Sequence, residues 1–245
     1  MMKISPHTNS MYNWAIILLL FLAVVASYSR QAFPVNLLIS ILTCSVLDIL
    51  IKKFLLKKKF SFPSTAIISG TIIGSIAPFS SNPLLVIVAS IVAILSKHII
   101  RFKGTNVFNP AATGLLVSLA IFSLNDEWWA ATSYNIIGYA IPLAFLLIIA
   151  NYKSRKLGIS LSFLLTLAIL YYISGFISLS FLPYYFAFIM LSEPKTSPYK
   201  IKEQIIYGIL MAILLFVLLS YSIKYSFFIA LLIGNIAYAL YKYFK

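Results

Sequence analysis

Acidic residues, cysteines and histidines are scarce in this chain. Only five Asp and Glu residues, one Cys and two His occur among its 245 residues. The single Cys44 excludes an intrachain disulfide and a multi-cysteine metal site, and His7 and His98 lie too far apart in the sequence to suggest a ligand pair. No Walker loop, HExxH motif, CxxC pair or nucleophile elbow occurs. The sequence therefore predicts no metal site and none of the common hydrolytic or nucleotide-binding sites.

Charged residues of either sign are also few. They make up 10% of the chain, against 62% hydrophobic residues, and the mean hydropathy is +1.00. So few polar side chains cannot cover a water-soluble globule, and a polytopic all-α membrane protein is expected. The net charge of +14 could suggest a nucleic-acid ligand. However, the Lys and Arg residues stand in short clusters between apolar runs, so no nucleic-acid partner is predicted.

The apolar runs predict about ten transmembrane helices in one membrane domain, residues 1–245. The third, fifth and eighth runs are short: residues 64–77 would reach only about 21 Å of the roughly 30 Å hydrocarbon core. Short runs of this kind are typical of half-helices or re-entrant elements. The expected helices cover residues 12–29, 33–51, 64–77, 84–100, 109–124, 136–150, 157–173, 182–192, 205–221 and 227–243.

The Lys and Arg residues support this helix count. With the N-terminus inside, 17 of the 19 fall in cytoplasmic segments, and only Arg30 and Lys224 fall outside. Such an asymmetry is a strong positive-inside signal and predicts a plasma-membrane protein with both termini in the cytoplasm. Trp128 and Trp129 then lie at the outer interface and Trp14 near the inner one. A cleaved signal peptide is an alternative for residues 1–30, but retention is favoured because residues 12–28 are long enough to span.

Two inverted five-helix repeats are expected, about residues 12–124 and 136–243. Each contains a short third helix followed by a break rich in Ser and Pro, at residues 76–83 and 191–198. Because five is odd, the second copy must be inverted relative to the first. In hydrocarbon every backbone polar group needs a partner, so polar breaks persist only where they are buried in protein or line a site. Residues 101–112 and 191–199 are therefore the first places to look for function.

At these breaks the chain resembles the RnfD/NqrB family, the membrane subunits of redox-driven ion pumps. Lys97 followed by Lys103-Gly-Thr-Asn-Val-Phe-Asn-Pro-Ala-Ala112 looks like the family's lysine, glycine turn and FNPA signature. Phe188-Ile-Met-Leu-Ser-Glu-Pro-Lys-Thr-Ser-Pro198 looks like its FFMATDPVTSP segment. Weaker echoes are Asp48, Ser69-Gly70 and Asn235. The cofactor-binding residues implied by this resemblance and by the loop described next are Ser69, Gly70, Lys97, Asn106, Asn109, Pro110, Asp126, Thr132, Glu193, Thr196, Ser197 and Asn235.

The resemblance implies a flavin. Members of the family carry FMN through a phosphoester to a threonine in a D-x-x-S-G-A-T motif outside, between helices 5 and 6. The corresponding loop here reads Asp126-Glu-Trp-Trp-Ala-Ala-Thr132. Asp126, Ala131 and Thr132 match the motif, while Trp129 and Ala130 replace its serine and glycine. An interfacial Trp-Trp loop with an incidental threonine is the alternative. A second flavin and a flavin transferase as partner are further expectations.

Several of these residues also have structural interpretations. Asn109-Pro110 fits a helix N-cap followed by proline at the first helical position. Gly70 and Gly74 form a GxxxG pair, which is commonly a close helix contact. Glu193 and Asp48 are candidates for function because they are ionisable near membrane depth. Solvated or lysine-paired roles fit them equally well.

The resulting hypothesis is an RnfD/NqrB-like membrane subunit of a flavin-dependent electron-transport system, with coupling of electron transfer to Na⁺ or H⁺ translocation as a further expectation. It would not be catalytic alone. Other membrane and soluble redox subunits are expected partners, because the chain has neither an iron–sulfur ligand set nor a nucleotide site. The alternative is a redox-silent channel or transporter for a small polar solute that uses the two breaks as its site. The breaks suit either function, so flavin content would decide between them.

Overall fold

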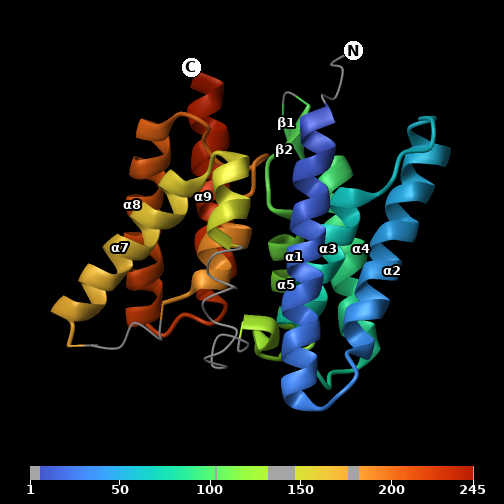
Figure 1. Ribbon diagram of the computed structural model, residues 1–245, viewed down its shortest axis with the longest axis horizontal. Coiled ribbons are helices and arrows are strands. Elements are labelled where there is room, and N and C mark those ends of the chain that lie inside the picture. The colour runs from blue at the N-terminus through green and yellow to red at the C-terminus, as the bar shows by residue number, and fades with distance from the viewer. Residues whose placement is uncertain (1–5, 103, 132–146, 176–181, 245) are drawn as a thin grey trace. The chain divides into compact units, whose positions relative to one another are not determined.

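The computed structural model describes residues 6–102, 104–131, 147–175 and 182–244 (Figure 1). The described residues form helices joined by loops, together with one two-stranded hairpin. The predicted all-α class is therefore confirmed. It divides into two compact units. Unit 1 consists of residues 1–99 and 110–146, and unit 2 of residues 100–109 and 147–245.

Unit 1 is built from helices that pack side by side. α2 contacts both α3 and α4, α4 contacts α5, and α1 contacts α3. The α2 helix continues without interruption into a π-helical turn, η1, so that together they form an apolar helix of 21 residues. The bounds are α1 Pro6–Arg30, α2 Val35–Leu50, η1 Ile51–Leu55, α3 Ser64–Ile76, α4 Pro83–Ile99 and α5 Pro110–Ile121.

The described residues of unit 2 include three long helices, a short π-helical segment, the hairpin and a helical stretch at residues 147–154. α8 packs against α7 and α9, and α7 also contacts η4. In the hairpin Arg101 pairs with Asn106 and Phe102 with Thr105, and Gly104 has the positive φ of +79° that a tight turn requires. The bounds are β1 Arg101–Phe102, β2 Thr105–Asn106, α7 Leu157–Ile173, η4 Phe186–Met190, α8 Ile201–Ser220 and α9 Ser226–Phe244.

Four described helices are long and apolar enough to cross a membrane, and they lie within α1, α2 with η1, α8 and α9. Shorter apolar helices stand where the short third and fifth runs were predicted, with 13 residues in α3 and 12 in α5. The expected eighth helix contains the five residues of η4. Most of the expected helix at 136–150 lies outside the described residues. The membrane class therefore holds, while the total of ten spans and the inverted repeats stay predictions.

Gly70 and Gly74 bring α3 unusually close to α2. A methyl group built on Gly70 would lie 2.7 Å from Cα of Ile41, and one on Gly74 would lie 2.5 Å from Cα of Leu37. Both neighbours are backbone atoms, which cannot move aside as a side chain can. The Ser40 hydroxyl uses this proximity to donate a 2.7 Å hydrogen bond to the Gly70 carbonyl. The close-packing interpretation of the GxxxG pair is therefore the one that the structure supports.

Candidate functional site

The helix break in unit 2 is held by side chains that pair its backbone carbonyls. Asn151 donates to the carbonyl of Phe188 at 2.7 Å, and Ser192 donates to the same oxygen at 2.6 Å. Ser160 donates to the Ala187 carbonyl at 2.8 Å. A short π-helical segment leaves such oxygens without a continuing helix to bond, and leaving them unpaired in an apolar surrounding is costly. These side chains therefore make the broken backbone compatible with burial.

Asn235, in the middle of α9, connects the two polar breaks at residues 101–112 and 191–199. Its Oδ1 accepts the backbone N–H of Asn109 at 2.8 Å, and its Nδ2 donates to the Thr196 carbonyl at 3.4 Å. Asn109 in turn donates from Nδ2 to the Met190 carbonyl at 3.4 Å. All three polar residues are at most 2% exposed. One amide side chain thus holds together segments that are far apart in the sequence.

The loop after η4 folds on itself around Glu193. The Thr196 hydroxyl donates to Glu193 Oε2 at 3.1 Å, and the Ser197 hydroxyl donates to the Glu193 carbonyl at 2.6 Å. Glu193 is half-buried, whereas Thr196 and Ser197 are buried. Ser and Thr hydroxyls that bond the nearby backbone in this way stabilise a turn at the expense of helix. The break is therefore encoded by its own polar side chains as well as by its prolines.

Lys156 closes the far side of this loop. Its ammonium group donates to the carbonyls of Ser197 at 2.9 Å and Pro198 at 2.8 Å and lies 3.8 Å from the ring centroid of Tyr199. The side chain is completely buried. Burial lowers its pKa to about 7, and the negative charge of Glu193 acts in the opposite direction. From the sequence, Lys156 was counted only among the basic residues of the predicted cytoplasmic segments. In the structure its side chain anchors the loop.

A small cavity of about 10 Å³ lies beside these residues. Asn106 of the hairpin, Thr196 and Asn235 line it together with Lys195 and Lys242. This volume is roughly that of one water molecule. The described arrangement can thus accommodate a water or a small ion among amide and carbonyl groups, and it is far too small for a flavin ring.

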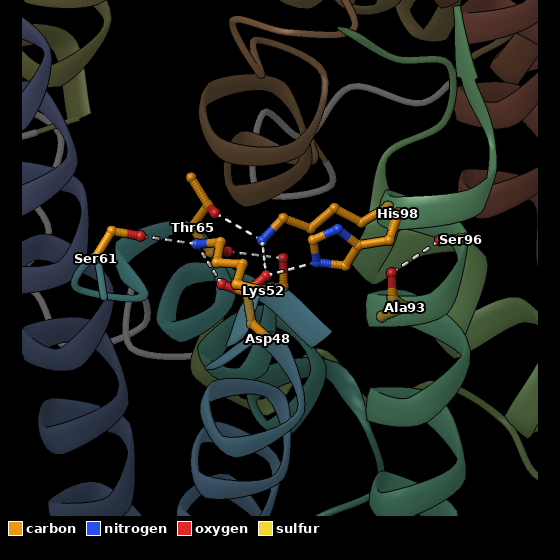
Figure 2. A network of polar contacts seen from close by, with 9 residues as sticks. Asp48, Lys52, Ser61, Thr65, Ala93, Ser96 and His98 are labelled. Atoms are coloured by element: carbon orange, nitrogen blue, oxygen red, sulfur yellow. Dashed lines mark hydrogen bonds and ion pairs between the residues drawn. The ribbon is translucent and has the colours of Figure 1, made fainter. Parts of the chain in front are cut away.

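A second polar cluster, in unit 1, surrounds the carboxylate of Asp48 (Figure 2). Lys97 Nζ and His98 Nε2 lie 2.9 and 2.8 Å from Asp48 Oδ1, and Lys52 Nζ lies 2.7 Å from Oδ2. Lys97 also donates to the Thr65 hydroxyl at 2.8 Å. Asp48 is fully buried and Lys97 is 7% exposed. Buried charges persist only when they are paired, and here one carboxylate serves several basic groups.

His98 and Lys52 are members of this cluster that the sequence reasoning did not select. They approach Asp48 from different elements: Lys52 from η1, one turn further along the same helix, and His98 from the last turn of α4. The only available signal was an acidic residue near membrane depth with basic residues close to the ends of neighbouring helices. The lysine-paired interpretation of Asp48 is the one that the geometry supports.

The loop after α5 is fixed to α3 by backbone and aromatic contacts. The N–H of Glu127 donates to the Ile76 carbonyl at 2.9 Å, and Trp129 Nε1 donates to the Gly74 carbonyl at 2.7 Å. The Glu127 carboxylate accepts the N–H of Phe79 at 2.6 Å and pairs with the exposed Arg30 at 2.5 Å. Trp129 is only 1% exposed, so it is a core side chain of unit 1.

The predicted site residues therefore separate into groups. Unit 2 brings together Asn106, Asn109, Glu193, Thr196, Ser197 and Asn235. In unit 1, Lys97 and Ser69 both bond Thr65, while Gly70 serves helix packing. Pro110 begins α5, and Asp126 accepts the indole N–H of Trp128. Thr132 lies outside the described residues.

Comparison with known families gives one clear match. The model of the family described as "NQR2, RnfD, RnfE family" matches residues 2–183, which is well over half of the chain. The matched range includes the Asp48 cluster, the hairpin with Asn109 and the loop after α5, and it ends before η4 and the break that follows η4. The comparison with curated proteins finds no match for this chain.

Proposed function

The chain belongs to the NQR2, RnfD, RnfE family, and from this premise we propose that it takes part in flavin-dependent electron transport coupled to Na⁺ or H⁺ movement. Family membership and the apolar helices make it a membrane subunit of the Rnf and Nqr type of complex. Plasma-membrane location, cytoplasmic termini, a flavin and redox subunits as partners belong to the proposal. The observation that carries it is the family match over residues 2–183.

FMN attached to Thr132 is the proposed cofactor. The backbone of residues 126–131, the described part of the loop, can be compared with what this attachment requires. Within residues 126–131 the positive φ, 51°, is at Trp128. Ala130, at the position of the motif's glycine, does not have a positive φ, so alanine is unstrained there. Asp126 and Ala131 match the motif, and Trp129 anchors the loop in place of the motif's serine. The backbone of residues 126–131 is therefore compatible with attachment at the next residue.

The chain's own residues would then hold the loop in place and pair the polar groups of the helix break. Trp129 and Glu127 hold residues 127–129 on the last turns of α3. A bound flavin supplies the capacity to accept and release electrons. In unit 2, the break pairs its carbonyls through the exchangeable side chains Asn235, Asn109 and Ser192. Such pairs permit a second arrangement, which is what ion access from alternate sides requires.

Covalent attachment can be tested on a denaturing gel. When the protein is co-expressed with a flavin transferase, we expect a fluorescent band that is lost in Thr132→Ala and kept in the matched control Ser133→Ala. The reason is that a phosphoester needs the hydroxyl of one specific residue. If the wild-type protein binds flavin but shows no band, the flavin is not covalently attached and the proposed attachment to Thr132 is wrong. A protein with no flavin that conducts a polar solute would favour the redox-silent transporter.

The proposed orientation can be tested by labelling single cysteines in a Cys44→Ser background. Cysteines at Lys58 and Lys153, both exposed, should react with membrane-impermeant maleimide only from the cytoplasmic side. A cysteine at the exposed Asn125 should react only from outside, because the Lys and Arg residues gather at the cytoplasmic ends. Lys156 is unsuitable for this experiment because it is buried. Labelling of Asn125 from the cytoplasm would contradict the orientation.

A further inference from the structure

We propose that the turn after α2 is a binding site for an anionic phospholipid, with its phosphodiester headgroup held by lysines and its acyl chains on neighbouring aromatic side chains. The site consists of residues 49–62 of unit 1. It does not depend on the flavin or on the break in unit 2. Three observations carry it: a basic cavity, an exposed apolar surface next to that cavity, and its place at the end of a full-length span.

The cavity has a volume of about 320 Å³, which lies at the lower end of the roughly 300–1,000 Å³ typical of small-ligand sites. Four lysines line it, and none of its lining residues is acidic. The remaining wall includes Ser61 and Phe60. The lining lysines are Lys52, Lys53, Lys58 and Lys59.

Local backbone geometry brings these lysines together. The π-helical turn η1 ends α2, and the N–H of Lys58 then bonds the Lys52 carbonyl at 2.9 Å. Lys57 takes a positive φ of 48° at the reversal. The chain thus returns beside the helix that it has just left, which places Lys58 and Lys59 next to Lys52 and Lys53. Like charges held this close repel one another, so an anion between them is favoured.

The lysines differ in what they already contact. Lys52 pairs with Asp48 and lies 3.5 Å from the Ser61 hydroxyl. Among the described residues, Lys53, Lys58 and Lys59 have no carboxylate within ion-pair distance, and all three are exposed. Three cations without a carboxylate partner are therefore available to an incoming phosphate, while Lys52 is already paired with Asp48.

Large apolar side chains stand beside this basic cavity. Phe54 is 64% exposed, Phe60 78% and Phe62 64%. A free phosphate ion would gain nothing from them, whereas the acyl chains of a lipid would cover them. The combination of a lysine-lined cavity with exposed aromatics thus matches an amphiphile rather than a soluble anion.

The depth of the site agrees with this choice. The apolar helix Val35–Leu55 has 21 residues, which is about 31 Å and close to the thickness of the hydrocarbon core. Its last turn therefore lies at the level of the lipid headgroups. Basic pockets at that level recognise anionic headgroups, because lysines near an anionic membrane surface are attracted to it.

Binding can be measured with the purified full-length protein in a neutral detergent. The probes are dioctanoyl phosphatidylglycerol, dioctanoyl phosphatidylcholine and inorganic phosphate, and the readouts are the rise in melting temperature and lipid adducts in native mass spectrometry. We expect phosphatidylglycerol to bind and to stabilise the protein, because a ligand that binds only the folded state raises its stability. Phosphatidylcholine and inorganic phosphate should bind at least about tenfold more weakly.

Two variants and a matched control test the residues. The triple change Lys53→Gln, Lys58→Gln and Lys59→Gln should weaken phosphatidylglycerol binding about 10- to 100-fold, as three surface lysines imply. Phe60→Ala with Phe62→Ala should weaken binding of the lipid but leave inorganic phosphate unaffected. The control, Lys153→Gln with Lys200→Gln and Lys202→Gln, removes the same charge from exposed positions elsewhere and should change affinity less than about twofold.

The outcomes are distinct. Equal losses in both triple variants would show a general charge effect and overturn the site. Phosphate that binds as tightly as the lipid would make it an anion site without lipid selectivity, and phosphatidylcholine that binds as tightly would remove the role of the lysines. Because none of these measurements involves flavin, the proposed function and this site can fail independently.

Discussion

Replacing Asn235 by leucine is expected to reduce flavin retention or ion transport much more than expression. The change removes the acceptor of the Asn109 N–H and the donor to the Thr196 carbonyl, both buried. Each unpaired group costs about 1–3 kcal/mol, so a loss of about 2–6 kcal/mol in the free energy of unfolding is expected as well. Cofactor content, transport and melting temperature should be measured on the same preparation and expressed per folded molecule.

Asn82→Leu is the matched control. Asn82 is an exposed residue whose Oδ1 caps the N–H of Leu84 at the start of α4, at 2.9 Å. Its loss should cost only about 1 kcal/mol and leave activity per folded molecule unchanged. Asn109→Leu, or Thr196→Val with Ser197→Ala, should resemble Asn235→Leu if the two breaks act together. Full activity per folded molecule in all three variants would remove the breaks from the mechanism.

Neutralising Asp48 should produce the largest loss of stability in unit 1. Asp48→Asn leaves the buried Lys97 ammonium and its neighbours without their shared counter-charge. Breaking a buried ion pair from one side costs about 3–5 kcal/mol. The measurement is the free energy of unfolding in detergent. Lys97→Met should cost less, because Lys52 and His98 still face the carboxylate.

A double-mutant cycle distinguishes charge from shape. Asp48→Asn combined with Lys97→Met should recover part of the loss, because the double change removes the buried ammonium group as well as its counter-charge. Lys52 is 22% exposed and can extend to solvent. The control is Glu127→Gln in the exposed pair with Arg30, whose side chains are 34% and 32% exposed. That change should cost no more than about 1 kcal/mol. Additive losses in the cycle would mean that Asp48 and Lys97 do not stabilise one another.

Much of the helix layout could be predicted because it depends on apolar run length. Residues 157–173 were expected to be helical, and α7 has these bounds. The hairpin at Arg101–Asn106 could not be predicted, because strands of two residues have no periodicity and Gly104 alone indicates only a turn. The π-helical segment η4 also depends on tertiary contacts, because carbonyls within it accept from distant side chains such as Asn151 and Ser160.

The candidate site was predictable where the motif itself carries the polar groups. Asn109, Thr196 and Asn235 were chosen from the sequence, and the structure brings them together. The Asp48 cluster was seen only in part, since its members are separated by up to 50 positions in the sequence and pairing at that distance depends on helix packing. Lys156 shows the same limit: it was counted only as a cytoplasmic charge, and no sequence pattern indicates that its side chain is buried.

The bond between Asn109 and Asn235 sets an order for biogenesis. The two residues are 126 positions apart. Residues 100–109 belong to unit 2, although the residues before and after them in the sequence belong to unit 1. At 5–20 residues per second, the ribosome needs roughly 6–25 s to reach Asn235 after it has made Asn109. During that interval the Asn109 N–H cannot yet donate to the Asn235 side chain. It must therefore stay near water, or be sheltered by the insertion machinery, until the last helix arrives.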